Sequence, residues 1–208
     1  MTTWIKICGM TNMEDAMEAA SLGVDALGFI FAPSPRRVEP SAAREIIRRL
    51  PPSVLKVGVF VDEALTEVRR LVDYCGLNMV QFHGQETPEY CRQVPLPVIK
   101  AVRVKSMESL QEMEEYPLAS ILLDAWSPQK AGGTGKPFCW EWALEACQKR
   151  NFILSGGLNP NNVYQAIRKV RPSGVDVCSG VEKTPGKKES TKMREFIKEV
   201  QKADASTR

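Results

Sequence analysis

The chain has 208 residues, of which 43% are hydrophobic and 25% are charged, and a formal net charge of +3 at pH 7. That length suits one α/β barrel with short loops, and the charge is too small to indicate nucleic-acid binding. No apolar run approaches the length of a membrane span, and six cysteines without a CxxC pair favour a reducing cytoplasm. We therefore expect one domain over residues 1–208, with a frayed tail at 203–208.

Short runs of apolar and β-branched residues recur along the chain and predict eight strands, at residues 3–8, 25–31, 55–61, 78–82, 97–102, 120–124, 152–155 and 174–178. Amphipathic stretches between them predict helices, most clearly at 13–22, 42–50, 65–75 and 161–170. Eight βα units of about 26 residues each predict a single (β/α)8 TIM barrel. Because Pro88 and Pro117 shorten the helices expected near 88–93 and 107–115, an open doubly wound sheet is the alternative.

Side chains alternate between the two faces of a strand, which predicts those that enter the barrel. With Ile5 and Ile7 under the helices, Lys6 and Cys8 point inward, and Asp124 does so at the end of its strand. The same reasoning places four further polar side chains inside: Gln81, His83, Lys100 and Asp176. Since buried charges need partners, we expect Lys6, Lys100 and Asp176 to form one network of ion pairs and hydrogen bonds.

Glycine turns follow the last two predicted strands, as Ser155-Gly156-Gly157-Leu158-Asn159-Pro160 and Cys178-Ser179-Gly180-Val181. Glycines let backbone N–H groups approach an anion, and barrel enzymes often bind phosphate at this position. Either turn alone is equally well explained as a tight connection. Together they predict a phosphate site formed by Gly156, Gly157, Ser179 and Gly180.

A third glycine-rich stretch covers residues 131–136. It is not a nucleotide-binding loop of the GxxxxGK[ST] type, because Lys130 stands where the first glycine belongs and Pro137 replaces the Ser or Thr. Its place shortly after Asp124 favours a lid that closes over a bound ligand, with a plain connector as the alternative.

The combined motifs, in this order and at these spacings, resemble the phosphoribosylanthranilate isomerase family of tryptophan biosynthesis. The resemblance runs from about residue 4 to 201 and is carried by Lys6-Ile7-Cys8-Gly9-Met10-Thr11, Gly28-Phe29-Ile30-Phe31, Val80-Gln81-Phe82-His83-Gly84, Leu122-Leu123-Asp124, Gly132-Gly133-Thr134-Gly135, the turn at 155–160 and Val175-Asp176-Val177-Cys178-Ser179-Gly180-Val181-Glu182.

The resemblance implies an Amadori rearrangement of N-(5-phosphoribosyl)anthranilate to 1-(2-carboxyphenylamino)-1-deoxyribulose 5-phosphate. It assigns Asp124 as the general acid that opens the sugar ring, Cys8 as the general base at the sugar C2, and an arginine to the anthranilate carboxylate. Spacing from Phe31 selects Arg37 rather than Arg36. His83 and Asp176 complete the candidate substrate-lining set, although a structural role is the simpler expectation for both.

The only partner implied is the phosphorylated aminosugar, with no cofactor, metal, nucleic acid or membrane, and the sequence is compatible with a homodimer. Two other classes stay open: another phosphosugar enzyme, and a phosphate-binding barrel without activity. A metal-dependent phosphosugar epimerase would need several histidines, and His83 is the only one. An indole-forming synthase would need an accessible catalytic lysine, whereas Lys6 and Lys100 lie deep. A phosphate-binding barrel without activity is disfavoured by the intact Cys8 and Asp124.

Each assignment also has a structural competitor. Cys8 could pack as a small buried hydrophobe, as cysteines usually do, and Arg37 could be a solvated loop charge.

Overall fold

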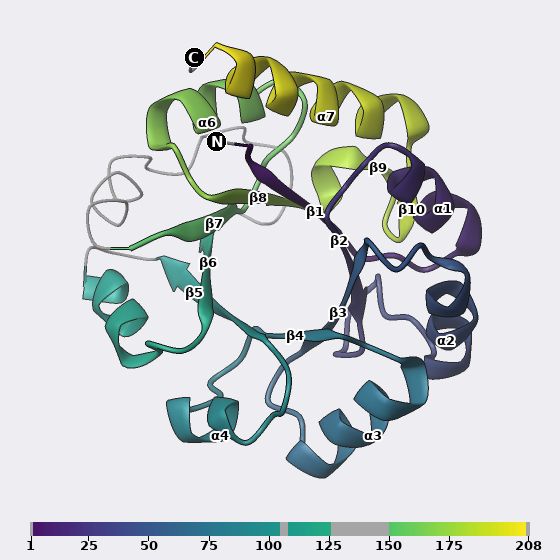
Figure 1. The fold of residues 1–208 in the computed structure, drawn as a ribbon, viewed down its shortest axis with the longest axis vertical. Helices are drawn as coiled ribbons and strands as arrows, with labels where there is room; N and C mark the ends of the chain where they lie inside the picture. The colour runs from purple at the N-terminus through teal and green to yellow at the C-terminus, as the bar shows by residue number, and fades with distance from the viewer. Residues whose placement is uncertain (1, 105–107, 126–149, 207–208) are drawn as a thin grey trace.

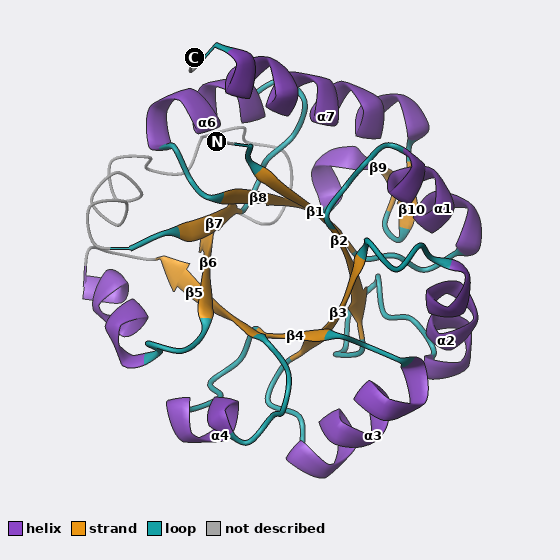
Figure 2. Cartoon of the chain, in the orientation of Figure 1, coloured by secondary structure: helices purple, strands orange, loops and turns teal. Residues whose placement is uncertain are grey.

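The computed structural model describes residues 2–104, 108–125 and 150–206. Eight parallel strands close into a barrel in chain order, from β1 to β8, and helices surround it (Figures 1 and 2). The predicted (β/α)8 barrel is thereby confirmed, and the open sheet is excluded because β8 pairs with β1.

The strand boundaries differ from those predicted by no more than two residues. The strands are β1 (Trp4–Cys8), β2 (Ala26–Ile30), β3 (Leu55–Phe60), β4 (Met79–Phe82), β5 (Val98–Val104), β6 (Ser120–Ala125), β7 (Phe152–Ser155) and β8 (Gly174–Val177). The helices are α1 (Met13–Ser21), α2 (Pro40–Arg49), α3 (Leu65–Cys75), α4 (Pro88–Arg92), α6 (Val163–Val170) and α7 (Ser190–Ala205). Two 3-10 helices, η1 (Glu108–Glu115) and η2 (Ser179–Val181), and a hairpin, β9 (Glu182–Thr184) and β10 (Lys187–Lys188), complete the described elements.

Local sequence signals set several helix ends. The side chain of Asn12 accepts a hydrogen bond from the Asp15 N–H at the start of α1, and Thr87 does the same for Tyr90 in α4. Gly76 ends α3 in the left-handed conformation, with φ of 75°. None of the helices in the described ranges combines the length and apolarity needed to cross a membrane.

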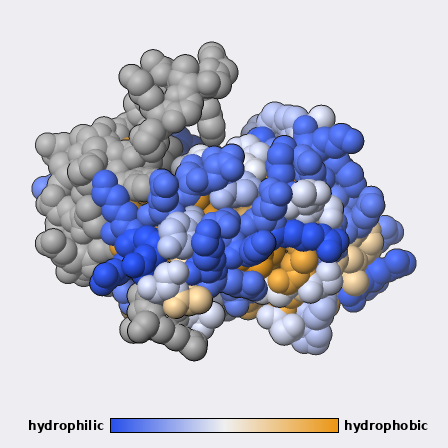
Figure 3. Space-filling model, turned by 90° about the horizontal axis from the view of Figure 1, so that it is seen from above, coloured by the Kyte–Doolittle hydropathy of each residue, from blue (hydrophilic) through white to orange (hydrophobic). Residues whose placement is uncertain are grey.

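Two apolar layers hold the barrel. A small inner cluster fills it, formed by Ala26, Val57, Ile99, Ala101, Leu122 and Ile153, whereas a large outer cluster lies between strands and helices. Ile5 and Ile7 belong to the outer cluster, which leaves Lys6 and Cys8 on the inner side as predicted. On the visible described surface, hydrophilic residues predominate, with small apolar areas between them (Figure 3).

The prediction for Lys100 is wrong. Its neighbours Ile99 and Ala101 occupy the inner cluster, so Lys100 lies on the helix side of β5. There its Nζ donates to the carbonyl of Gly84 at 2.6 Å and pairs with Glu86 at 3.0 Å. The expected single network therefore splits in two: Lys6 pairs with Asp176, and Lys100 pairs with a carboxylate of the outer layer.

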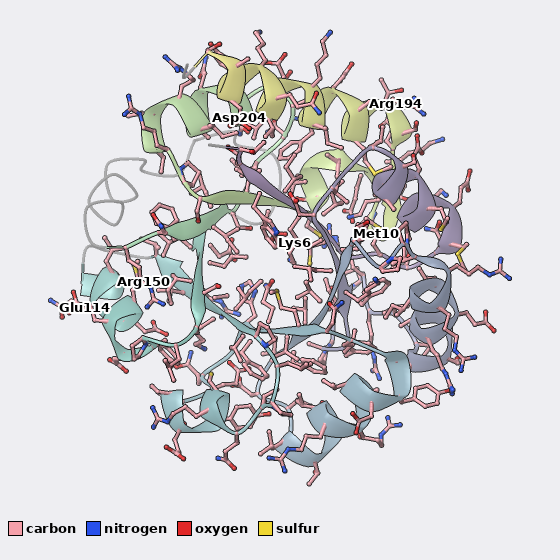
Figure 4. The ribbon with its side chains drawn as sticks, viewed as in Figure 1. Lys6, Met10, Glu114, Arg150, Arg194 and Asp204 are labelled. Atoms are coloured by element: carbon pink, nitrogen blue, oxygen red, sulfur yellow. The ribbon has the colours of Figure 1, made fainter. Side chains whose placement is uncertain are left out.

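The prediction of a frayed tail is also wrong for residues 203–206. Helix α7 continues through Ala205, and Ala203 is buried against the outer core. The Asp204 carboxylate accepts hydrogen bonds from the backbone N–H and the hydroxyl of Thr3, at 2.9 and 2.6 Å. The two chain ends therefore lie close together (Figures 1 and 4).

Candidate active site

A buried ion pair lies beneath the carboxyl ends of β1 and β8. Lys6 is directly opposite Asp176 in the strand register, and its Nζ lies 2.8 Å from Asp176 Oδ1. Ser155, at the end of β7, donates its hydroxyl to the other carboxylate oxygen at 3.1 Å. Figure 4 shows Lys6 within the ring of strands. Asp176 is thus held by two neighbours, as expected for a residue that balances an interior lysine.

Cys8 follows this pair at the end of β1 and is 5% exposed. A hydrogen bond from the Cys178 thiol is the largest effect on it and lowers the pKa of the Cys8 thiol. Burial opposes the thiolate, whereas the positive charges of Lys6 and Lys188 favour it. A cysteine with a depressed pKa suits proton abstraction rather than mere packing.

Lys188, on β10, joins the ends of β1 and β8, and the sequence analysis did not identify it. Its fully buried Nζ donates to the carbonyl of Cys8 at 2.6 Å and to that of Cys178 at 3.2 Å. It also pairs with Glu182 at 3.0 Å. A hairpin of two- and three-residue strands has no hydrophobic periodicity, so only the residue pair Lys187-Lys188 could have drawn attention to it.

The structure separates the two candidate arginines. Arg36 forms a bidentate pair with Glu182, through Nε at 2.8 Å and a terminal nitrogen at 2.7 Å, whereas the side chain of Arg37 is exposed. Gly9 has φ of 78°, and a Cβ there would lie 3.1 Å from both Arg36 Cδ and Cys178 Sγ. The missing side chain at Gly9 lets Arg36 approach the thiols, whereas the assignment of the substrate carboxylate to Arg37 stays a prediction.

Asp124 lies one residue before the end of β6, on the inner side, and is paired with His83, which follows β4. The His83 Nε2 atom lies 3.1 Å from Asp124 Oδ2, and Nδ1 lies 3.3 Å from the Gln81 amide nitrogen. With that amide nitrogen as the donor to Nδ1, the proton of a neutral His83 lies on Nε2, where it is available to Asp124. The side chains of His83 and Asp124 are 23% and 26% exposed, which leaves both open to a ligand.

Two features of this group of residues point to a ligand. In the described part of the chain the buried Gln81 Oε1 has no hydrogen-bond partner. A polar cavity of about 240 Å³ adjoins His83 and is lined also by Gly84, Gln85, Ala101, Arg103, Ser109 and Glu112.

The two predicted phosphate turns pack against each other. A Cβ at Gly180 would overlap with the carbonyl oxygen of Leu158, so only glycine fits between them. Gly156 and Gly157 have φ of 86° and 70°, and a Cβ at Gly157 would meet no described atom within 4 Å. The turn before α6 is held by Asn162, which donates its side-chain amide to the carbonyl of Gly157 at 3.0 Å. The predicted lid, 131–136, lies outside the described residues.

A second cavity, of about 630 Å³, opens at the other end of the barrel, among the strand N-termini. Its lining includes Trp4, Leu55, Met79 and Phe152, and among the described lining residues the charged one is Arg150. The Arg150 guanidinium donates to the backbone carbonyl of Tyr116 at 2.8 Å. Groups suited to proton transfer therefore gather at the carboxyl end.

Comparison with known proteins agrees with this geometry. Residues 5–199 match the family model described as N-(5'phosphoribosyl)anthranilate (PRA) isomerase. The chain is 51% identical to the N-(5'-phosphoribosyl)anthranilate isomerase of Pelobacter propionicus over 93% of each chain, and 52% identical to that of Desulforudis audaxviator over 97% of this chain and 99% of the relative.

The similarity extends to solved structures. The phosphoribosyl anthranilate isomerase of Thermotoga maritima superposes with a TM-score of 0.91 at 44% identity, over 97% of this chain and all of that one. A structure of such an isomerase in complex with reduced 1-(o-carboxyphenylamino)-1-deoxyribulose 5-phosphate superposes with a TM-score of 0.88 at 42% identity, over the same shares of the two chains. The chain belongs to the N-(5'-phosphoribosyl)anthranilate isomerase family.

Proposed function

We propose that this chain isomerises N-(5-phosphoribosyl)anthranilate to 1-(2-carboxyphenylamino)-1-deoxyribulose 5-phosphate in tryptophan biosynthesis, with Cys8 as general base and Asp124 as general acid. One observation carries the assignment: a thiol with a depressed pKa and a hydrogen-bonded carboxyl group stand at the same end of one barrel. An aminoaldose-to-aminoketose rearrangement needs one proton donor and one proton acceptor at neighbouring sugar atoms.

The first step opens the sugar ring. Asp124, protonated in the complex, gives its proton to the ring oxygen while the bond between that oxygen and C1 breaks. The lone pair of the anthranilate nitrogen forms a C1=N bond, which leaves a protonated Schiff base. The hydrogen bond from His83 to Oδ2 fixes the carboxyl group, so that Oδ1 faces the substrate.

The second step moves the proton from C2. The Cys8 thiolate takes it, and the C–H electron pair forms a C1=C2 bond while the C1=N pair returns to nitrogen. The resulting enolamine loses its C2 hydroxyl proton and gains one at C1, which yields the ketone. The thiol proton then passes through solvent to the carboxylate and restores both groups.

Binding is assigned to the groups around this centre. The turns with Gly156, Gly157, Ser179 and Gly180 offer backbone N–H groups to the phosphate. For the anthranilate carboxylate the sequence selects Arg37, whereas the position of Arg36 beside the thiols supports Arg36 for the same role.

The direct test follows the fluorescence of freshly prepared N-(5-phosphoribosyl)anthranilate with purified protein and EDTA present. The proposal expects steady consumption that EDTA does not change, with the aminoketose as the product by chromatography. No consumption, or consumption abolished by EDTA and restored by a divalent metal, would overturn it.

The oligomeric state does not alter this assignment. A solved structure concerns monomers generated from the dimeric isomerase of Thermotoga maritima, and the sequence of this chain is compatible with a homodimer. Every residue assigned above comes from a single chain, so we expect the site to be complete in each subunit. Light scattering during gel filtration would measure the state.

A further inference from the structure

The structure places a second thiol beside Cys8. In the register between β1 and β8, Lys6 lies opposite Asp176, and Ile7 lies opposite Val177. One position further along both segments stand Cys8 and Cys178. Neighbouring strands are about 4.8 Å apart, so these two side chains are adjacent. Their mutual interaction lowers the pKa of Cys8 and raises that of Cys178.

The partners of Cys178 decide which thiol donates. The Nζ of Lys188 lies 3.9 Å from Cys178 Sγ, within hydrogen-bond range for sulfur, and can only donate to it. The lone pairs of Cys178 Sγ face this cation, so its S–H turns away from Lys188, and the adjacent Cys8 sulfur is the acceptor that we assign to it.

The geometry points to Cys178 as a positioning residue of the isomerase: its thiol donates a hydrogen bond to the Cys8 thiolate, polarised by Lys188, and keeps Cys8 in the form that abstracts a proton. The inference rests on the proposed function only in that it names Cys8 as the base. The adjacency of Cys8 and Cys178 follows from the strand register alone.

The surrounding charges agree with this direction. Lys6 and Lys188 favour a negative Cys8, and Asp176 opposes it. The hydrogen bond to Cys8 and burial both raise the pKa of Cys178, so Cys178 keeps its proton. Arg36, held by Glu182, adds a further positive charge near both sulfurs. Lys188 and Arg36 also lower the pKa of Cys178, but burial and the interaction with Cys8 raise it more, so the pair holds one acid and one base.

The test removes the hydrogen-bond donor at position 178 and changes the side-chain volume there as little as possible. Cys178→Ala lacks a donor, Cys178→Ser retains one, and Cys75→Ala deletes a buried thiol at the end of α3 as a matched control. Two readouts are recorded against pH: the ultraviolet absorbance of the Cys8 thiolate, taken as the difference from the same protein with Cys8→Ser, and kcat/KM for the isomerisation.

A thiol is a weak donor, so we expect Cys178→Ala to move the Cys8 titration upward by about one pH unit, and the acid limb of kcat/KM with it. At pH values on the acid side of both titrations, kcat/KM of Cys178→Ala is about tenfold lower than that of the wild type. Cys178→Ser keeps the titration near that of the wild type, and Cys75→Ala leaves both curves in place. If Cys178→Ala does not fold, Cys178→Val supplies the variant without a donor.

Two outcomes overturn the inference: a Cys8 titration unchanged in the variant without a donor, or equal shifts with Ser and Ala. The absorbance needs no turnover, which separates the two proposals. If the titration moves in Cys178→Ala but kcat/KM does not, the thiol pair stands and the role of Cys8 as base falls.

Discussion

Replacing Lys6 by Met tests how far the buried ion pair beneath the thiols supports the barrel. Lys6 is 0% exposed, and its Nζ lies 2.8 Å from Asp176 Oδ1. Burial alone lowers the pKa of Lys6, but the nearby Asp176 and Cys8 outweigh it and raise the pKa above its ordinary value. The lysine is therefore charged in the folded protein, and its removal leaves a buried carboxylate without a cation.

Breaking a buried pair in this way costs about 3–5 kcal/mol. The hydroxyl of Ser155 still donates to Asp176, which places the expected loss near the lower end of that range. With a urea dependence of about 2–3 kcal/mol per M for a chain of this size, the unfolding midpoint falls by about 1–2 M. Adding Asp176→Asn to Lys6→Met removes the isolated charge and restores part of the loss.

Urea unfolding followed by circular dichroism measures these changes. Lys202→Met is the matched control, because the Lys202 side chain is 59% exposed and its pair with Glu199 spans 3.4 Å. Such a surface pair contributes no more than about 1 kcal/mol. A midpoint for Lys6→Met equal to that of Lys202→Met would refute the claim that the interior pair is a major part of stability.

Three further results are expected. Arg36→Ala raises KM by about tenfold or more, because it removes a partly buried cation beside the thiols, whereas Arg37→Ala changes KM less than threefold. The reverse order in steady-state kinetics would assign the anthranilate carboxylate to Arg37. His83→Ala lowers kcat by about tenfold, since the acid loses the donor that orients it, and His83→Asn recovers part of that loss; equal kcat in all three proteins would leave His83 without a positioning role. As the pH falls, kcat/KM decreases because the Cys8 thiolate gains a proton, and we expect the midpoint of this decrease below the ordinary thiol pKa of 9.0. A midpoint at or above 9.0 would contradict the depressed pKa of Cys8.

Alternation of apolar residues and the placement of glycines were enough to predict the barrel from sequence. They placed Lys6, Cys8 and Asp124 on the inner face, where the structure has them. The same alternation gave the wrong face for Lys100, because the sequence offered no reason to place Ile99 rather than Lys100 in the narrow barrel interior. The partner Glu86, fourteen residues earlier, becomes its neighbour only when β4 and β5 pair.

The remaining parts of the site depend on contacts between distant segments. Lys188 reaches Cys8 across 180 positions of sequence, and Arg36 meets Glu182 across 146. Such pairs leave no local pattern in the sequence. The end of α7 was missed for the same reason: Asp204 is anchored by Thr3, at the opposite end of the chain.

The central claim is that Cys8 and Asp124 transfer the protons, and the most direct measurement is turnover set against binding in Cys8→Ser and Asp124→Asn. For each variant kcat is compared with the affinity for reduced 1-(o-carboxyphenylamino)-1-deoxyribulose 5-phosphate, measured by calorimetry. We predict that kcat falls by about 10²- to 10⁴-fold in each while the dissociation constant of the analogue changes less than tenfold. Wild-type turnover in either variant would contradict the account.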